Sequence, residues 1–250
     1  MKYRTLGRTG LKVSEIGLGG EWFNGLTAKE STAIVDAAQE HGINYIDIFM
    51  PQAPTRDNLG IALQGRRDQF IIQGHLCTIY EDGQYTRTRD IEKTKRSFAD
   101  LLERLHTDYI DVGMIHYVDS EEDFQTVFEG PVLEYAKELK KKGVIRHIGM
   151  SSHNPHIALK AVESGWIDVL MFSINPAYDM EAADTDIYDL MEFKGMEKSG
   201  LVVDEARQKL QRRSHYRYEA LGSRYAAESG EFPLWCGHDG SSVHSILSGP

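Results

Sequence analysis

Short apolar runs rich in β-branched residues alternate with longer amphipathic stretches through most of the chain. This alternation is typical of repeated βα units around a parallel sheet, because strands covered on both faces are apolar throughout whereas the covering helices are apolar on one side. The pattern therefore predicts an α/β fold with six strands. The predicted strands span Glu15–Leu18, Ile43–Ile48, Phe70–Gln73, Tyr109–Ile115, Arg146–Met150 and Val169–Ile174.

The stretches between these strands have the apolar spacing of helices. Thr27 and Glu30 are placed as in a capping box, and Gly42 suits the left-handed backbone that ends a helix, so the first helix is predicted at Thr27–His41. The alternation of these helices with the strands is that of a (β/α)8 TIM-type barrel. The other predicted helices span Thr55–Gln64, Arg89–Leu105, Glu122–Lys142 and Pro155–Ser164.

The last part of the chain departs from a complete barrel. Such a barrel takes about 250 residues, yet the sixth strand is already reached at Ile174 and the βα rhythm then stops. Asp179–Gly200 is acidic and rich in methionine, and after Leu210 glycines, serines and arginines interrupt both the helical and the strand period. We therefore expect an incomplete barrel with about six βα units in residues 1–210, and an irregular tail without a buried strand in residues 211–250.

Composition argues against several classes of function. The formal net charge of -10 disfavours binding to nucleic acid or to an anionic membrane, since both attract basic patches. Cys77 and Cys236 lie far apart in the sequence, without the spacing of a zinc site or a disulfide framework. No apolar run approaches the roughly 18–20 residues that span a bilayer, and the start of the chain lacks the apolar core of a signal peptide. We therefore expect a cytoplasmic protein without a metal site.

Five segments follow one another in the order of landmarks from one enzyme family: YRTLGRTGLKVSEIGLGG, GINYIDI, LGIAL, DYIDVGMIH and GVIRHIGMSSHNP. On these segments the sequence resembles the aldo-keto reductase family from about Lys2 to Leu210, and its opening is similar to the family's N-terminal hairpin and first barrel strand. FSINPAYDM, which begins at Phe172, is similar to a bacterial branch with a C-terminal iron–sulfur extension, although the cysteines of this chain lack the spacing for such a cluster.

The resemblance implies NADP(H)-dependent reduction of a small-molecule carbonyl substrate. In the family, a tyrosine hydroxyl gives the proton, a lysine lowers the pKa of that tyrosine, and an aspartate and a histidine orient the pair. Asp47, with Leu59 and Gly60 twelve and thirteen residues later, fits the family's frame and puts Gln52 in the tyrosine's place. His75 stands in the lysine's place, and the family's histidine is retained as His116.

The altered residues raise the question of which group supplies the proton. A glutamine amide cannot give a proton usefully near neutral pH, although it can hydrogen-bond to a carbonyl oxygen. Imidazoles titrate near neutral pH, and active sites of this fold class gather at the carboxyl ends of the strands. Our hypothesis is that His116 or His75 donates the proton while Asp47 orients or charges the site. The alternative is that these histidines are only hydrogen-bonded to their neighbours.

The resemblance also points to residues for the cofactor. Ser151 and Ser152 stand where the family holds the nicotinamide carboxamide with a serine and an asparagine, and Met171 stands where it uses a glutamine. Gly19 and Gly20 match the loop that passes close to the cofactor, although a glycine there can also serve turn geometry alone. No GxGxxG motif opens a helix, so a Rossmann fold finds no support.

The family's seventh and eighth strands, whose loops hold the cofactor phosphates, have no recognisable counterpart after Leu210. Divergence, truncation and a shifted reading frame are the three explanations. A frame shift near Leu210–Ser214 can turn His215–Ala220 into Ile-Thr-Val-Met-Lys, which is similar to the family's seventh strand. A six-stranded arc has open edges, so we expect low stability and weak NADPH affinity.

Three interpretations therefore stay open. The chain is an NADPH-linked oxidoreductase with an altered acid, a catalytically silent barrel that binds a small ligand or a protein, or an inactive truncated gene product. The sequence identifies neither the substrate nor the oligomeric state, because the specificity loops of such barrels are their least constrained part.

Overall fold

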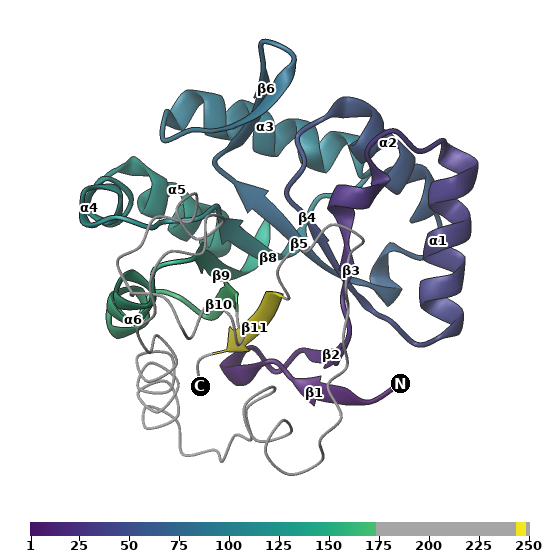
Figure 1. Cartoon of the computed structure of the whole chain (residues 1–250), viewed down its shortest axis with the longest axis horizontal. Helices are drawn as coiled ribbons and strands as arrows, with labels where there is room; N and C mark the ends of the chain where they lie inside the picture. Colours follow the sequence, from purple (N-terminus) through teal and green to yellow (C-terminus); the bar gives the residue numbers. More distant parts are fainter. Residues whose placement is uncertain (174–243, 249–250) are drawn as a thin grey trace, which may run out of the picture. The chain divides into compact units, whose positions relative to one another are not determined.

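The computed structural model describes residues 1–173 and 244–248 (Figure 1). The predicted acidic segment Asp179–Gly200 and most of the predicted tail lie outside these residues. The described residues belong to two compact units. The first unit contains Met1–Thr5, Leu11–His116 and Gln125–Ile148, and the second contains Leu6–Gly10, Tyr117–Phe124 and the described residues from Gly149 onward.

Strands β3, β4, β5 and β8 of the first unit pair in parallel in that order. Every residue of β8 is buried, as expected for a strand covered on both faces. The register places Asp47 beside Gln73 and His75 beside Met114. These strands span Leu18–Gly19 (β3), Tyr45–Ile48 (β4), Ile71–Leu76 (β5) and Ile110–Ile115 (β8). Ahead of them, β1 (Tyr3–Thr5) and β2 (Lys12–Ser14) form an antiparallel hairpin, as the resemblance implies.

Helices α1 (Ala28–Glu40), α2 (Ala53–Ala62) and α3 (Ile91–Arg104) alternate with these strands (Figure 1). The predicted capping box of α1 is confirmed: the Thr27 hydroxyl accepts a hydrogen bond from the Glu30 N–H, and the Glu30 carboxylate accepts one from the Thr27 N–H. Helix α3 lies so close to β5 that a Cβ on Gly74 would come within 2.8 Å of Leu101 Cδ2. Gly74 therefore lets the helix approach the strand.

The helix predicted at Glu122–Lys142 is two helices, α4 (Glu121–Phe128) and α5 (Pro131–Lys141). Proline favours the first turn of a helix because it lacks an N–H, so Pro131 starts a new helix rather than continuing one. A Cβ on Gly130 would lie 2.2 Å from the Thr126 carbonyl oxygen, so only glycine fits this junction. The prediction of one helix was wrong because the apolar spacing continues across the Gly-Pro break.

A hairpin that the sequence analysis did not predict follows β5. Strands β6 (Thr78–Glu81) and β7 (Gln84–Arg87) pair antiparallel, and Tyr80 lies opposite Tyr85. Asp82 and Gly83 form the turn with positive φ angles of 53° and 80°, the backbone of the two-residue turns that suit the twist of a hairpin. The hairpin belongs to the first unit, as do β5 and β8.

In the second unit, the end of β9 (Ile145–Ser152) pairs in parallel with β10 (Val169–Ser173). Helix α6 (Pro155–Glu163) connects the two strands and begins at Asn154, whose side chain accepts hydrogen bonds from the first backbone N–H groups of the helix. Strand β11 (His244–Ser248) pairs antiparallel with β10. This strand lies within the predicted tail of residues 211–250, and serines surround its short apolar centre.

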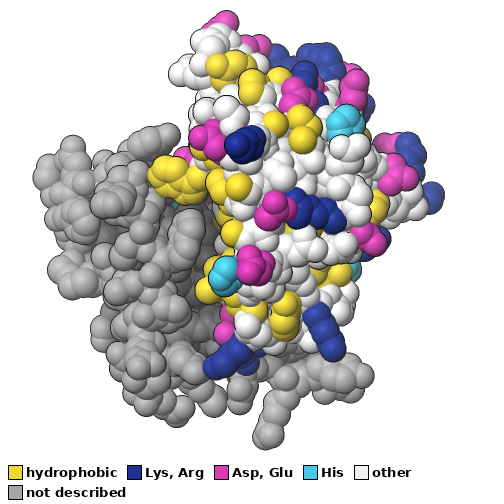
Figure 2. Space-filling model, turned by 90° about the vertical axis from the view of Figure 1, so that its right-hand side faces the viewer, with side chains coloured by type: hydrophobic (Ala, Val, Ile, Leu, Met, Phe, Trp, Pro, Cys, Tyr) yellow, Lys and Arg dark blue, Asp and Glu magenta, His cyan; other side chains and the backbone are white. Residues whose placement is uncertain are grey.

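The described residues therefore form an α/β fold of the (β/α)8 TIM type, with six parallel strands joined by helical segments. The first barrel strand, Leu18–Gly19, shares only Leu18 with its predicted range Glu15–Leu18, and the other five strands overlap their predicted ranges more fully. Acidic and basic side chains are interspersed on the face shown in Figure 2. None of the described helices has the length and apolar character that a membrane crossing requires.

Candidate active site

Three side chains at the carboxyl ends of neighbouring strands form a hydrogen-bonded chain. Asp47 is next to last in β4, His75 is next to last in β5, and His116 directly follows β8. Asp47 Oδ1 lies 2.9 Å from His75 Nε2, and His75 Nδ1 lies 2.7 Å from His116 Nδ1. The structure thus brings together three of the residues that the sequence singled out, at the strand ends where active sites of this fold class lie.

The Asp47 carboxylate sets the direction of this chain. An ionised carboxylate only accepts hydrogen bonds, so His75 Nε2 carries a proton. When both rings are neutral, His75 Nδ1 must accept and His116 Nδ1 must donate, which leaves His116 Nε2 as an acceptor. One carboxylate therefore determines the tautomers of both histidines.

The acceptor on His116 is met by a tyrosine that the sequence analysis missed. Tyr85, on β7, places its hydroxyl within hydrogen-bonding distance of His116 Nε2, so the hydroxyl donates to the neutral ring. The two rings meet edge to face, with centroids 5.6 Å apart and planes at 88°. Phe49 stacks on the His116 ring at 5.6 Å and meets the Tyr85 ring edge to face, also at 5.6 Å. These contacts hold the hydroxyl and the imidazole in place.

Behind Asp47 the series of hydrogen bonds continues into the interior of the protein. Gln73 Nε2 donates a hydrogen bond to Asp47 Oδ1 at 2.7 Å, and the Tyr45 hydroxyl donates one to Gln73 Oε1 at 2.6 Å. Burial raises the pKa of Tyr45 well above its usual value, and the charges of Asp47 and Asp111 raise it further. Tyr45 therefore stays protonated and orients the Gln73 amide, which in turn orients the Asp47 carboxylate.

Gln52 stands in the family's tyrosine position, but its side chain is not part of the hydrogen-bonded series of Asp47, His75 and His116. It is the residue just before α2, and its backbone carbonyl accepts a hydrogen bond from the Arg56 N–H at 3.2 Å. Its side chain does not cap the helix. The Gln52 Oε1 atom is buried, and no described residue gives it a hydrogen bond. Because buried polar atoms are normally hydrogen-bonded, a bound molecule that donates to this amide oxygen would be stabilised there.

The two glycines predicted near the cofactor differ in their surroundings. A Cβ on Gly20 would lie 2.5 Å from the Asp47 carbonyl oxygen, so close packing against β4 requires glycine there. Gly19 has nothing within 4 Å of the position that a Cβ would take. Gly20 therefore has a structural reason to be glycine, whereas Gly19 leaves open space beside the strand end.

The other predicted cofactor residues lie in the second unit. Ser151 and Met171 are direct partners in the register of β9 and β10, so their side chains share a face. The Ser152 hydroxyl is committed elsewhere, since it donates to the Val118 carbonyl at 2.7 Å and accepts from the Asn154 N–H at 3.1 Å. Ser151, rather than Ser152, has a hydroxyl that no hydrogen bond within the described residues occupies.

Asp119 organises the segment around Ser152. Its carboxylate accepts hydrogen bonds from the His153 backbone N–H at 2.7 Å and from the His153 ring at 2.9 Å. Burial alone would raise the pKa of Asp119, but the hydrogen bonds and charge of His153, together with the Ser152 hydroxyl, outweigh burial and hold this pKa below its usual value. Asp119 is therefore a fixed negative charge at the end of β9.

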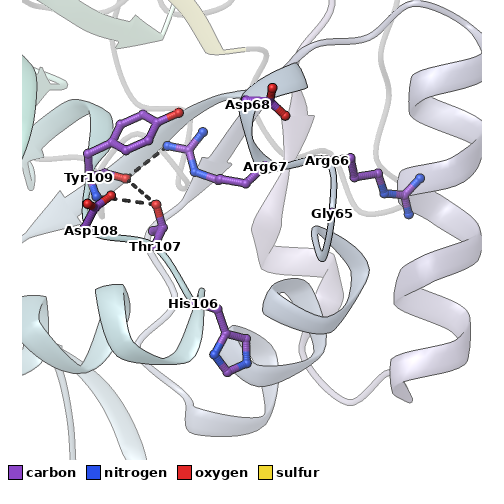
Figure 3. Close-up of a pocket in the computed structure, with 8 residues that line it drawn as sticks. All are labelled: Gly65, Arg66, Arg67, Asp68, His106, Thr107, Asp108 and Tyr109. Carbon is purple, nitrogen blue, oxygen red and sulfur yellow. Dashed lines mark hydrogen bonds between the residues drawn. The ribbon is translucent and has the colours of Figure 1, made fainter.

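A surface hollow of about 600 Å³ lies at the amino ends of β5 and β8, away from the carboxyl ends that carry His75 and His116 (Figure 3). Its lining comes from Gly65–Asp68, before β5, and from His106–Tyr109, before β8. Arg67 stacks on the Tyr109 ring at 4.3 Å and pairs with the buried Asp111 at 2.9 Å. In this fold class the amino ends of the strands serve stability, so we place the candidate active site at the carboxyl ends.

Comparison with known proteins places the chain in a family. A sequence model of the aldo/keto reductase family matches residues 15–198. An uncharacterized oxidoreductase of Bacillus subtilis is 31% identical over 179 residues, which cover 70% of this chain and 56% of the relative. L-Galactose dehydrogenase of Arabidopsis thaliana is 30% identical over 183 residues, covering 68% of this chain and 56% of that enzyme. The chain thus spans about half the length of the curated relatives it matches.

Solved structures show the same likeness. The holo form of an aldo-keto reductase from Bacillus halodurans superposes with a TM-score of 0.62 and 31% identity, covering 70% of this chain and 58% of that one. The Pseudomonas aeruginosa protein PA4992, described as an aldo-keto reductase, superposes with a TM-score of 0.63 and 28% identity, covering 76% of this chain and 73% of that one.

Proposed function

Since the chain belongs to the aldo/keto reductase family, we propose that it is an NADP(H)-dependent oxidoreductase that reduces a small carbonyl compound. The observation that carries the proposal is the chain of Asp47, His75 and His116 at the carboxyl ends of three neighbouring strands. Reduction of a carbonyl needs a proton as well as two electrons, and these residues can hold and move a proton.

The residues around the strand ends fit a nicotinamide dinucleotide in part. In the first unit, Gly19 leaves open space and the buried Gln52 Oε1 can accept from a carboxamide N–H. In the second unit, Ser151 offers a hydroxyl beside Met171. Ser152 does not fit, because its hydroxyl is already used within the protein. The sequence after Leu210 has no recognisable counterpart of the family strands whose loops hold the cofactor phosphates.

A reduced nicotinamide would supply the hydride when bound, and the protein would then have to meet the negative charge that develops on the carbonyl oxygen. The hydrogen-bonded histidines then contribute the proton: the Asp47 carboxylate stabilises positive charge on one of the two rings, and the ring that loses its proton becomes neutral. General acid catalysis of this kind accelerates a reaction by about 10²–10⁴-fold.

NADPH oxidation by the purified full chain, followed by absorbance against a panel of aldehydes and ketones, tests the proposal. We expect turnover that His75→Ala and His116→Ala each lower by about 10²-fold or more. His156→Ala serves as a matched control, because His156 is an exposed residue of α6 in the second unit. Turnover that survives both changes would remove the histidines from the mechanism.

A catalytically silent barrel that binds a small ligand is the second candidate. Gln52 favours it, because the residue in the family's tyrosine position has no proton to give near neutral pH and has a buried oxygen to which no described residue donates. This candidate predicts that NADPH or another ligand changes fluorescence on binding while no carbonyl of the panel is reduced. Binding without turnover would therefore favour a silent barrel over a reductase.

A further inference from the structure

We infer that Tyr85 is the group that hands the proton to the substrate oxygen in this site. The inference rests on the proposed function and names the acid that a reductase with Gln52 in the tyrosine's place would use. Tyr85 lies on β7, a different element from the one that Gln52 precedes, and its phenol hydroxyl lies within hydrogen-bonding distance of His116.

The hydrogen bonds of the two histidines support this assignment. His75 uses one ring nitrogen toward Asp47 and the other toward His116, while His116 uses one toward His75 and the other toward Tyr85. Both histidines are almost fully buried, with 4% and 7% of their surface exposed, whereas Tyr85 is partly exposed. Asp47 and Tyr85 end the hydrogen-bonded chain and are both partly exposed, but an ionised carboxylate only accepts hydrogen bonds. The Tyr85 hydroxyl is therefore the group that can donate a proton to a substrate.

The proposed proton transfer starts with one of the two histidines as an imidazolium, which supplies the proton that the substrate finally receives. Hydride transfer would leave negative charge on the substrate oxygen, and the Tyr85 O–H bond would break as the new O–H bond forms on that oxygen. His116 Nε2 gives its proton to the phenolate oxygen, so Tyr85 ends as a phenol and His116 as a neutral ring. Asp47 stabilises the imidazolium before transfer through His75, and solvent returns the proton afterwards.

The neighbouring tyrosine of the same hairpin shows what a purely structural hydroxyl does. Tyr80 lies directly opposite Tyr85, is 51% exposed, and donates to the Gly83 carbonyl at 2.8 Å within its own hairpin. The Tyr85 hydroxyl instead reaches His116, 31 residues away in the sequence. Phe49 fixes the Tyr85 ring from the side, so removing the hydroxyl alone leaves the aromatic packing intact.

The test compares Tyr85→Phe with Tyr80→Phe in the full chain, using a carbonyl that the wild-type chain reduces. We expect Tyr85→Phe to lower kcat by about 10²-fold or more while NADPH affinity stays unchanged, and Tyr80→Phe to leave both unchanged. Nitrogen NMR of the ring signals adds a second reading. The His116 Nε2 signal is expected to shift in Tyr85→Phe and to stay in place in Tyr80→Phe.

Two results would overturn the role of Tyr85 alone: a Tyr85→Phe chain that turns over as the wild type does, or one that loses turnover without any shift of the His116 nitrogen signals. The proposed reductase function would survive either result. A wild-type chain that binds NADPH but reduces no carbonyl would overturn the proposed function and the donor role together.

Discussion

The imidazole rings of His75 and His116 meet through their Nδ1 atoms, which lie 2.7 Å apart. Two nitrogens in this position share one proton, because two N–H groups cannot donate to each other. The tautomer of one ring therefore fixes that of the other, and the contact of Asp47 Oδ1 with His75 Nε2 at 2.9 Å fixes both.

Asp47→Asn is accordingly expected to lower turnover by about 10²–10⁴-fold, since an amide can donate to His75 Nε2 and reverse the direction of the chain. Absorbance of NADPH during turnover measures the effect. Asp36→Asn, at an exposed residue of α1, is the matched control. An Asp47→Asn chain with wild-type kcat would show that the tautomers do not matter to the reaction.

Gly20→Ala and Gly19→Ala are expected to change different properties, the first the stability of the protein and the second its affinity for NADPH. Alanine at position 20 would press on the Asp47 carbonyl oxygen, 2.5 Å from the new Cβ, and lower the free energy of unfolding by about 1–3 kcal/mol. Alanine at position 19 meets nothing within 4 Å and should leave stability unchanged but weaken NADPH binding. Urea unfolding and NADPH fluorescence titration separate the two. Unchanged NADPH affinity in Gly19→Ala would argue against a cofactor beside β3.

Arg56→Met is expected to lower the free energy of unfolding by about 3 kcal/mol. Arg56 is only 1% exposed, and its guanidinium donates to the Ser97 carbonyl at 2.8 Å and to Asp100 Oδ2 at 2.7 Å. Burial lowers the pKa of Arg56, while the hydrogen bond and charge of Asp100 act in the opposite direction. The shift of the urea midpoint measures the loss, and Arg96→Met, at an exposed residue of α3, should stay within about 0.5 kcal/mol of wild type.

Stability is expected to fall with acid through Asp119. Its folded pKa lies below the usual value, so the unfolded chain binds more protons and the contribution of Asp119 is complete above its unfolded pKa of about 3.9. That contribution is lost as the pH falls from this value through the lower folded pKa. Thermal midpoints between about pH 6 and pH 3 should therefore fall less steeply for Asp119→Asn than for wild type.

Glu40→Gln is the control for this measurement, because Glu40 is an exposed residue at the end of α1. It should follow the wild-type curve. An Asp119→Asn chain whose midpoint falls as steeply as that of the wild type would mean that the bonds to His153 do not favour the ionised carboxylate.

The sequence could predict much of this fold because buried parallel strands are apolar throughout and because Thr27, Glu30 and Gly42 mark the ends of α1. It placed Asp47, His75 and His116 at strand ends through their spacing within a family frame. It missed Tyr85, because the strands of the β6–β7 hairpin are short and carry no alternating apolar pattern. The signal that could have found the hairpin was the Asp82-Gly83 pair, a common two-residue turn.

The roles of Gln73 and Tyr45 could not be read from the sequence for a different reason. Both lie in strands where the pattern predicts only burial, and their hydrogen bonds depend on the register that sets Asp47 beside Gln73. A period of two says which residues share a face but not which neighbouring strand lies alongside, or at which offset.

The turn at Asp82 and Gly83 has a consequence for how such a site can change. The turn fixes which residue of β7 lies opposite Tyr80, and a slip of one position would point Tyr85 to the other face of the hairpin and away from His116. A single inserted or deleted residue in a surface loop could thus switch the acid of this site on or off without altering any residue of the barrel strands.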